Sequence, residues 1–225
     1  MIKKIRSVKG VFQVLFLLSL FSNQSEGIAQ VYGQNGMVVS SNELASKVGL
    51  EVLKKGGNAI DASIATAFAL AVTHPSAGNI GGGGFLVFLN AKGEVTTIDF
   101  REKAPLAASP TMFLDKQGML IDGSNHDSLL SVGVPGTVAG LYMAHQKYGQ
   151  LPWRELVEPA VDLAKKGFVM PWGLYKEALQ VVEDNKTNAF MKRYFNSEKE
   201  AVTKPGELWK QPALAKTLEL IRDKG

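Results

Sequence analysis

Four consecutive glycines occupy positions 81–84, directly before the apolar run Phe85–Leu89. Glycine loses more conformational freedom on folding than any other residue, so such a run is retained where the backbone must pass very close to another segment. The run therefore predicts tight packing of backbone and sheet beside the buried, alanine-rich helix that precedes it. The same close approach would also shape the wall of a substrate site.

A phosphate-binding loop is the alternative interpretation of these glycines, because free backbone amides can cradle an anion. Phosphate loops follow a strand and open a helix, whereas here a helical segment precedes the glycines and a strand follows them. The order of elements therefore disfavours a phosphate site.

Two helices are expected before the glycines. Ser41 or Asn42 can cap the first, whose apolar residues recur at helical spacing until Gly56 stops it. The second covers residues 59–72 and is apolar on nearly all faces, which is typical of a buried helix. Its many alanines allow a neighbouring layer to approach closely.

A hairpin is expected after the glycines, with strands at residues 85–89 and 95–100 and a turn at residues 90–93. The first strand is continuously apolar, which predicts burial on both faces, and the second alternates, which predicts half burial. Antiparallel strands after buried helices favour an α+β fold with helices packed on a sheet over a doubly wound sheet.

The second half of the sequence is expected to be mostly helical. Residues 107–131 are rich in turn-forming residues and predict a long loop near the candidate substrate site. A helix then follows from Thr137 to Tyr148. Pro159 removes an internal donor and should split the helical segment 153–166 into two pieces. Two further helices are expected at 171–185 and 213–222, with no linker dividing the chain.

Residues 1–29 have the three parts of an export signal: a basic start, an apolar stretch at residues 11–21 and a small-x-small cleavage pattern. The apolar stretch is about half of the roughly 20 residues that span a bilayer, which disfavours the alternative of an uncleaved anchor. We therefore expect residues 30–225 to form the mature protein. It should be periplasmic or secreted and should not insert stably into the membrane.

The charge balance changes when this signal is set aside. Removing its four basic residues and one acidic residue leaves 21 Lys and Arg against 20 Asp and Glu, so the net charge falls from +4 to +1. No excess of basic residues remains to attract nucleic acid. The chain also has no cysteine and only three isolated histidines, so neither a metal site nor another cofactor is expected.

Arg101 is the candidate binding residue, because it follows an apolar strand close to the glycine run. A guanidinium presents a planar fork of donors that matches a carboxylate. The alternative is a structural ion pair with Asp99 or Glu102. Two other polar residues are assigned structural roles: Asp61 as a buried group bonded to a neighbouring loop, over a part in the site, and His74 as a hydrogen-bonding residue.

Three motifs together resemble the γ-glutamyltranspeptidase family. They are the segment 49–61 with its Lys-Lys-Gly-Gly-Asn-Ala-Ile-Asp, the segment 73–105 with the glycine run and Asp-Phe-Arg-Glu, and Pro-Gly-Thr-Val-Ala-Gly at 135–140. The resemblance extends from about Gly36 to the end of the sequence. It implies an N-terminal-nucleophile hydrolase with an αββα sandwich, of which this chain is the first part of the large subunit.

The resemblance also implies an activity. Family members transfer or hydrolyse the γ-glutamyl group of glutathione and related compounds through an acyl-enzyme on the N-terminal threonine of a small subunit. Arg101 matches the arginine that grips the α-carboxylate of that group. No segment matches the family's Thr-Thr-His processing motif, so we expect no catalytic residue here, an inactive chain on its own, and a small subunit or C-terminal half as partner.

Two alternatives to this activity stay open. A related acylase, acting on glutaryl-cephalosporins or poly-γ-glutamate, would keep the scaffold and Arg101 but accept another acyl group. A non-catalytic exported remnant or binding module would instead leave an apolar face without cover.

Overall fold

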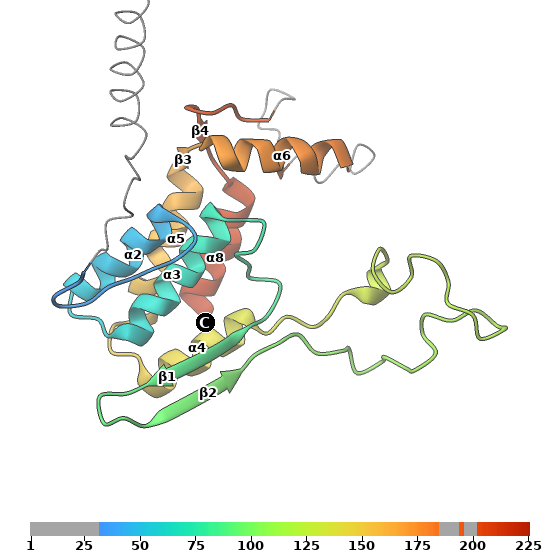
Figure 1. Cartoon of the computed structure of the whole chain (residues 1–225), viewed down its shortest axis with the longest axis horizontal. Coiled ribbons are helices and arrows are strands. Elements are labelled where there is room, and N and C mark those ends of the chain that lie inside the picture. The colour runs from blue at the N-terminus through green and yellow to red at the C-terminus, as the bar shows by residue number, and fades with distance from the viewer. Residues whose placement is uncertain (1–31, 185–193, 196–201) are drawn as a thin grey trace, which may run out of the picture. The chain divides into compact units, whose positions relative to one another are not determined.

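The computed structural model describes residues 32–184, 194–195 and 202–225 (Figure 1). The export signal expected at residues 1–29 lies outside the described residues. Contacts within the chain separate residues 1–35 from residues 36–225, and the elements below all belong to the second unit. None of the described helices combines the length and the hydropathy that crossing a bilayer requires.

The two helices expected at the start of this unit are present, and the first is capped as its sequence indicates. Helix α2 (Glu43–Lys54) begins at Asn42, whose Oδ1 accepts the backbone N–H of Leu44 at 2.9 Å. It is followed by Gly56, whose φ of 91° suits glycine. Helix α3 (Ala59–Thr73) is the buried helix, with Ile64 and Phe68 fully inside the core.

The helical core forms around α3, which packs against α2 on one side and α5 (Trp153–Lys166) on another (Figure 1). Helix α8 (Pro212–Lys224) packs in turn on α5. Small residues let these helices approach closely, and larger apolar side chains fill the space between them. Fully buried members of this core include Ile64, Phe68, Val72, Leu156, Val157 and Leu218.

The hairpin forms an antiparallel pair, β1 (Phe85–Leu89) and β2 (Val95–Asp99), in which Phe85 lies opposite Asp99. Ile98 on its inner face joins the core. The expectation that the first strand is buried on both faces is wrong for this structure: Phe85, Val87 and Leu89 are 65 %, 73 % and 64 % exposed. Among the described residues only one face of the hairpin is covered, so the continuous apolar run alternates in burial.

Helix α4 (Thr137–Tyr148) starts and ends where expected, but the predicted break at Pro159 does not occur. Helix α5 runs continuously through this proline. Pro159 is only half-buried, while Leu156, Val157 and Ala160 beside it are fully buried against the core. Packing of that apolar face therefore outweighs the loss of one backbone hydrogen bond.

The long excursion expected at residues 107–131 is present as a series of turns with one short 3₁₀ helix, η1 (Leu129–Ser131). Its base is closed by paired backbone bonds between Lys103 and Val134. A short strand pair not expected from the sequence joins β3 (Phe168–Val169) to β4 (Leu208–Trp209). Helix α6 (Trp172–Asp184) follows β3, close to the predicted limits.

Candidate functional site

Arg101 lies two residues beyond the end of β2, at the end of the hairpin where β1 begins. Its side chain is exposed. The backbone N–H of Arg101 donates a hydrogen bond of 3.0 Å to Oδ1 of Asp99. This short-range bond shapes the turn after the strand, so Asp99 acts on the backbone of Arg101.

The guanidinium of Arg101 does not form the ion pair with Asp99 or Glu102 that was the structural alternative. Among the described residues, no salt bridge involves Arg101. Its Cζ instead lies 5.9 Å from the centre of the Phe85 ring. Such a cation–π contact orients the guanidinium and leaves its planar edge of N–H donors available to an external carboxylate.

Two glycine segments enclose the backbone next to Arg101. A Cβ on Gly83 would lie 2.6 Å from the carbonyl oxygen of Phe100 and 2.7 Å from Cα of Arg101, closer than such atoms approach. A Cβ on Gly136 would meet the same carbonyl oxygen from the start of α4. The glycines are therefore needed for close packing, but the neighbour differs from the alanine-rich helix that the sequence indicated.

Hydrogen bonds connect these segments as well. The N–H of Phe100 donates to the carbonyl of Gly84 at 3.0 Å, which continues the pairing of β1 and β2 by one step. The carbonyl of Gly82 accepts the N–H groups of Gly136 at 2.8 Å and Thr137 at 3.1 Å. The glycine run, the segment after β2 and the first turn of α4 thus form one hydrogen-bonded unit around Arg101.

Asp61 has the structural role that its sequence context favoured. Its side chain is fully buried, and its oxygens accept backbone N–H groups from Asn58 at 2.9 Å, Gln150 at 3.0 Å and Leu151 at 3.3 Å. Bonds to several amides compensate a buried carboxylate for lost hydration. Asp61 therefore joins the start of α3 to the loop between α4 and α5.

His74 also takes part in local structure, at the C-terminal end of α3. Its backbone N–H donates to the carbonyl of Leu70 at 2.8 Å. Its Nδ1 lies 3.5 Å from Oγ of Ser76, at the limit of a hydrogen bond. These contacts agree with the expected hydrogen-bonding role.

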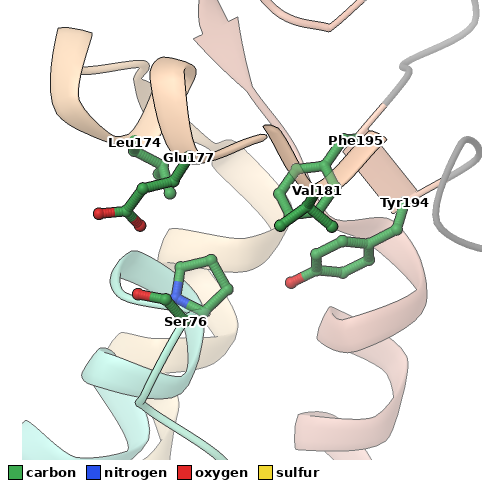
Figure 2. Close-up of a pocket in the computed structure, with 7 residues that line it drawn as sticks. Ser76, Leu174, Glu177, Val181, Tyr194 and Phe195 are labelled. Atoms are coloured by element: carbon green, nitrogen blue, oxygen red, sulfur yellow. The ribbon is translucent and has the colours of Figure 1, made fainter. Parts of the chain in front are cut away.

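A separate cavity of about 340 Å³ lies between α6 and the turn that follows α3 (Figure 2). Figure 2 shows Leu174, Glu177 and Val181 of α6 on its upper side, with Ser76 below and Tyr194 beside it. The phenol of Tyr194 donates to Oε1 of Gln211 at 2.7 Å, and burial raises the pKa of Tyr194 to about 12. The cavity is mostly apolar and includes neither Arg101 nor the glycine run.

No candidate metal centre accompanies Arg101 in the part of the chain that the structure describes. There, no three His, Cys, Asp or Glu side chains come together in a way that could hold a metal ion. The described surroundings of Arg101 are thus its own exposed guanidinium, the Phe85 ring and the closely packed glycine backbone.

The sequence singled out Arg101 as a candidate but did not indicate the residues that contact it. Phe85 was assigned only to a buried strand, although the hairpin register that places it opposite Asp99 brings its ring near Arg101. Gly136 is noted only as part of the Pro-Gly-Thr-Val-Ala-Gly motif at 135–140. Its contact with Phe100 depends on tertiary packing, and no local pattern in the sequence signals it.

Comparison with known proteins gives consistent relatives. Residues 45–225 match the family model described as gamma-glutamyltranspeptidase. The glutathione hydrolase proenzyme of Pseudomonas sp. (strain A14) is 45% identical over 217 residues, which cover 96% of this chain and 38% of that protein. The chain spans about a third of the length of the curated relatives it matches.

Solved structures agree with this match. The gamma-glutamyltranspeptidase of Helicobacter pylori superposes with a TM-score of 0.81 at 44% identity, covering 86% of this chain and 56% of that one. A cephalosporin acylase from Bacillus halodurans superposes with a TM-score of 0.73 at 29% identity, covering 89% of this chain and 38% of that one. The α+β arrangement is thus that of N-terminal-nucleophile hydrolases, and the chain belongs to the γ-glutamyltranspeptidase family.

Proposed function

We propose that this chain supplies the donor-binding part of an enzyme that hydrolyses or transfers the γ-glutamyl group of glutathione and related compounds. The observation that carries the proposal is Arg101: an exposed guanidinium oriented by Phe85, with no acidic partner among the described residues. Its fork of donors would bind the α-carboxylate of the γ-glutamyl group and so fix the position of the γ-amide.

The reactive group in this proposal comes from a further segment, a small subunit or C-terminal half that begins with a threonine. Its hydroxyl oxygen attacks the γ-carbonyl carbon, the C–N bond breaks, and the amine leaves with a proton from the hydroxyl. Water, or an acceptor amine, then releases the glutamyl group. The 225-residue polypeptide alone is expected to be inactive, which an assay of γ-glutamyl-p-nitroanilide hydrolysis by the pure chain would test.

Arg101→Met in the complete mature protein tests the central claim. The assay compares γ-glutamyl-p-nitroanilide with 4-aminobutyryl-p-nitroanilide, which lacks the α-carboxylate but is otherwise the same donor. Loss of a bidentate, charge-assisted contact should lower kcat/KM for the first about 100-fold and leave the second unchanged. An unchanged preference of Arg101→Met for the γ-glutamyl donor would rule out the proposal. Arg101→Lys keeps only the charge, so its kcat/KM for this donor should lie between those of the parent and Arg101→Met.

A related acylase is the second candidate function. It is favoured by the superposition on the cephalosporin acylase of Bacillus halodurans, and a glutaryl group would also offer Arg101 a carboxylate. Hydrolysis rates of glutathione and glutaryl-7-aminocephalosporanic acid by the mature protein separate the two. Faster hydrolysis of the glutaryl compound would favour the acylase. A poly-γ-glutamate substrate is assayed in the same way.

We also propose that residues 1–29 are removed on export, so that the mature chain begins at Gln30 in the periplasm or outside the cell. The supporting feature is the three-part signal in the sequence. The intact mass and N-terminal sequence of the exported protein test this. A chain that retains its N-terminus and stays with the membrane would instead indicate an uncleaved anchor.

A further inference from the structure

Asn79 lies between the end of α3 and the glycine run, and its side-chain oxygen joins two distant parts of the chain. Oδ1 accepts the backbone N–H of Gly82 at 2.9 Å and the hydroxyl of Thr137 at 2.6 Å. Thr137 is 58 residues further along the chain, is buried, and is the first residue of α4. A single acceptor atom therefore connects the glycine loop to the start of this helix.

The same two segments hold the backbone of Arg101 between them. The carbonyl of Gly82 accepts hydrogen bonds from the N–H groups of Gly136 and Thr137. Gly83 and Gly136 both pack closely against the carbonyl of Phe100. No side chain separates these backbones, so a displacement of either segment is transmitted directly to Arg101 Cα. Asn79 acts on the guanidinium through this enclosed backbone.

We infer that Asn79 and the hydroxyl of Thr137 form a positioning pair, which sets the Arg101 guanidinium at the distance that the donor carboxylate requires. The inference rests on the proposed function, because it assigns Arg101 to that carboxylate. Neither residue contacts the donor. Displacement of a bidentate group by a fraction of an ångström weakens its bond to a planar partner, so loss of the pair should reduce donor recognition selectively.

The experiment measures donor discrimination in the complete mature protein, defined as kcat/KM for γ-glutamyl-p-nitroanilide divided by kcat/KM for 4-aminobutyryl-p-nitroanilide. Asn79→Ala removes the acceptor. Thr137→Val removes only the hydroxyl and keeps the shape of the side chain. Each should lower discrimination about tenfold, chiefly by raising KM for the γ-glutamyl donor. Thr137→Ser keeps the hydroxyl and should restore discrimination.

A matched control separates positioning from stability. Asn58→Ala removes the cap of α3, which lies outside the Arg101 unit, and should lower stability without changing discrimination. The double variant Arg101→Met/Asn79→Ala should discriminate no less than Arg101→Met alone, because Asn79 acts through Arg101. Circular dichroism confirms the fold of each variant, and Thr137→Val provides the test if Asn79→Ala does not fold.

The outcomes distinguish this inference from the function beneath it. Suppose that Arg101→Met abolishes discrimination, while Asn79→Ala and Thr137→Val either leave it intact or lower kcat/KM equally for both donors. The positioning role is then overturned and the proposed function stands. If Arg101→Met itself leaves discrimination unchanged, the proposed function is overturned first.

Discussion

The carboxylate of Asp61 accepts the backbone N–H of Gln150 at 3.0 Å, although 89 residues separate them in the chain. The same side chain closes the capping box of α3 by accepting the N–H of Asn58. One buried residue thus fixes both the start of the central helix and the loop that connects α4 to α5.

Asp61→Asn should destabilise the fold by about 2–3 kcal/mol, because an amide N–H₂ would replace an oxygen that accepts backbone donors in a buried place. Urea denaturation of the purified polypeptide measures the loss. Ser63→Ala on the exposed side of α3 is the matched control and should change stability by less than about 0.5 kcal/mol. Unaltered stability with lost activity would instead point to a role for Asp61 in the site.

Gly83→Ala should destabilise the protein by about 1–3 kcal/mol and raise KM for the donor, because the new methyl group meets the Phe100 carbonyl and Arg101 Cα. Denaturation and steady-state kinetics give the two effects. Gly81→Ala is the control within the same run, since its Cβ would meet no atom within 4 Å. Equal effects of the two substitutions would contradict the close packing described for Gly83.

Phe85→Leu should raise KM for the γ-glutamyl donor about two- to fivefold, because it removes the ring that orients the Arg101 guanidinium at an exposed site. Phe85→Tyr keeps an aromatic face and should behave as the unaltered protein does. Steady-state kinetics with γ-glutamyl-p-nitroanilide and 4-aminobutyryl-p-nitroanilide measure the change. KM should rise for the first donor and stay the same for the second, which lacks the α-carboxylate. Identical KM values for Phe85→Leu and the parent would count against the contact.

Tyr194 should make the fold sensitive to alkaline pH. Burial raises the pKa of Tyr194 to about 12, from 10.0 for a free tyrosine, so the folded state retains a proton that the unfolded state loses. This contribution to stability is complete below pH 10 and disappears as the pH rises toward 12. Its size is at most about 2 kcal/mol, because the side chain is only partly buried.

Tyr194→Phe tests this through its difference from the parent protein. Near pH 8 the variant should be less stable by about 1 kcal/mol, because Gln211 loses its hydrogen bond from the phenol. That difference should shrink between pH 10 and pH 12 in urea denaturation curves. Tyr32→Phe, at a residue that is 78% exposed, should follow the parent at every pH.

The uncovered face of the hairpin should bind a hydrophobic dye in the isolated 225-residue polypeptide. Phe85, Val87, Leu89 and Val95 are all more than half exposed on this face. Val87→Thr should lower dye fluorescence, and Thr97→Val, at the cross-strand partner of Val87, should raise it. The polypeptide could instead be a monomer by ultracentrifugation and bind no dye in the fluorescence assay. That result would contradict the interpretation that this face lacks a covering layer, and with it the need for a partner segment.

Local patterns predicted the helices well, because capping and hydrophobic periodicity are encoded within a few residues. Asn42 and the segment 59–72 led directly to α2 and α3. Pro159 shows the limit of such rules: a local penalty was outweighed by the buried face of α5, which becomes visible only in the packed structure.

The sequence singles out one residue of the candidate site and none of its surroundings. Arg101 could be selected from its chemistry, its place after a strand and the family motif. The contacts of Phe85, Asn79 and Gly136 depend on strand register and on segments far apart in sequence, so no short pattern encodes them. The two-residue strands β3 and β4 were missed for a similar reason, because each forms only against the other.

The bond between Asn79 and Thr137 also bears on the order of events during folding. Their separation of 58 residues means that a large loop must close before the arginine is held in place, whereas α2, α3 and the hairpin arise from local contacts. A nascent or partly folded chain would therefore have its helices before the backbone around Arg101 is enclosed. Ordering of the segment around Arg101 is thus a late event in maturation.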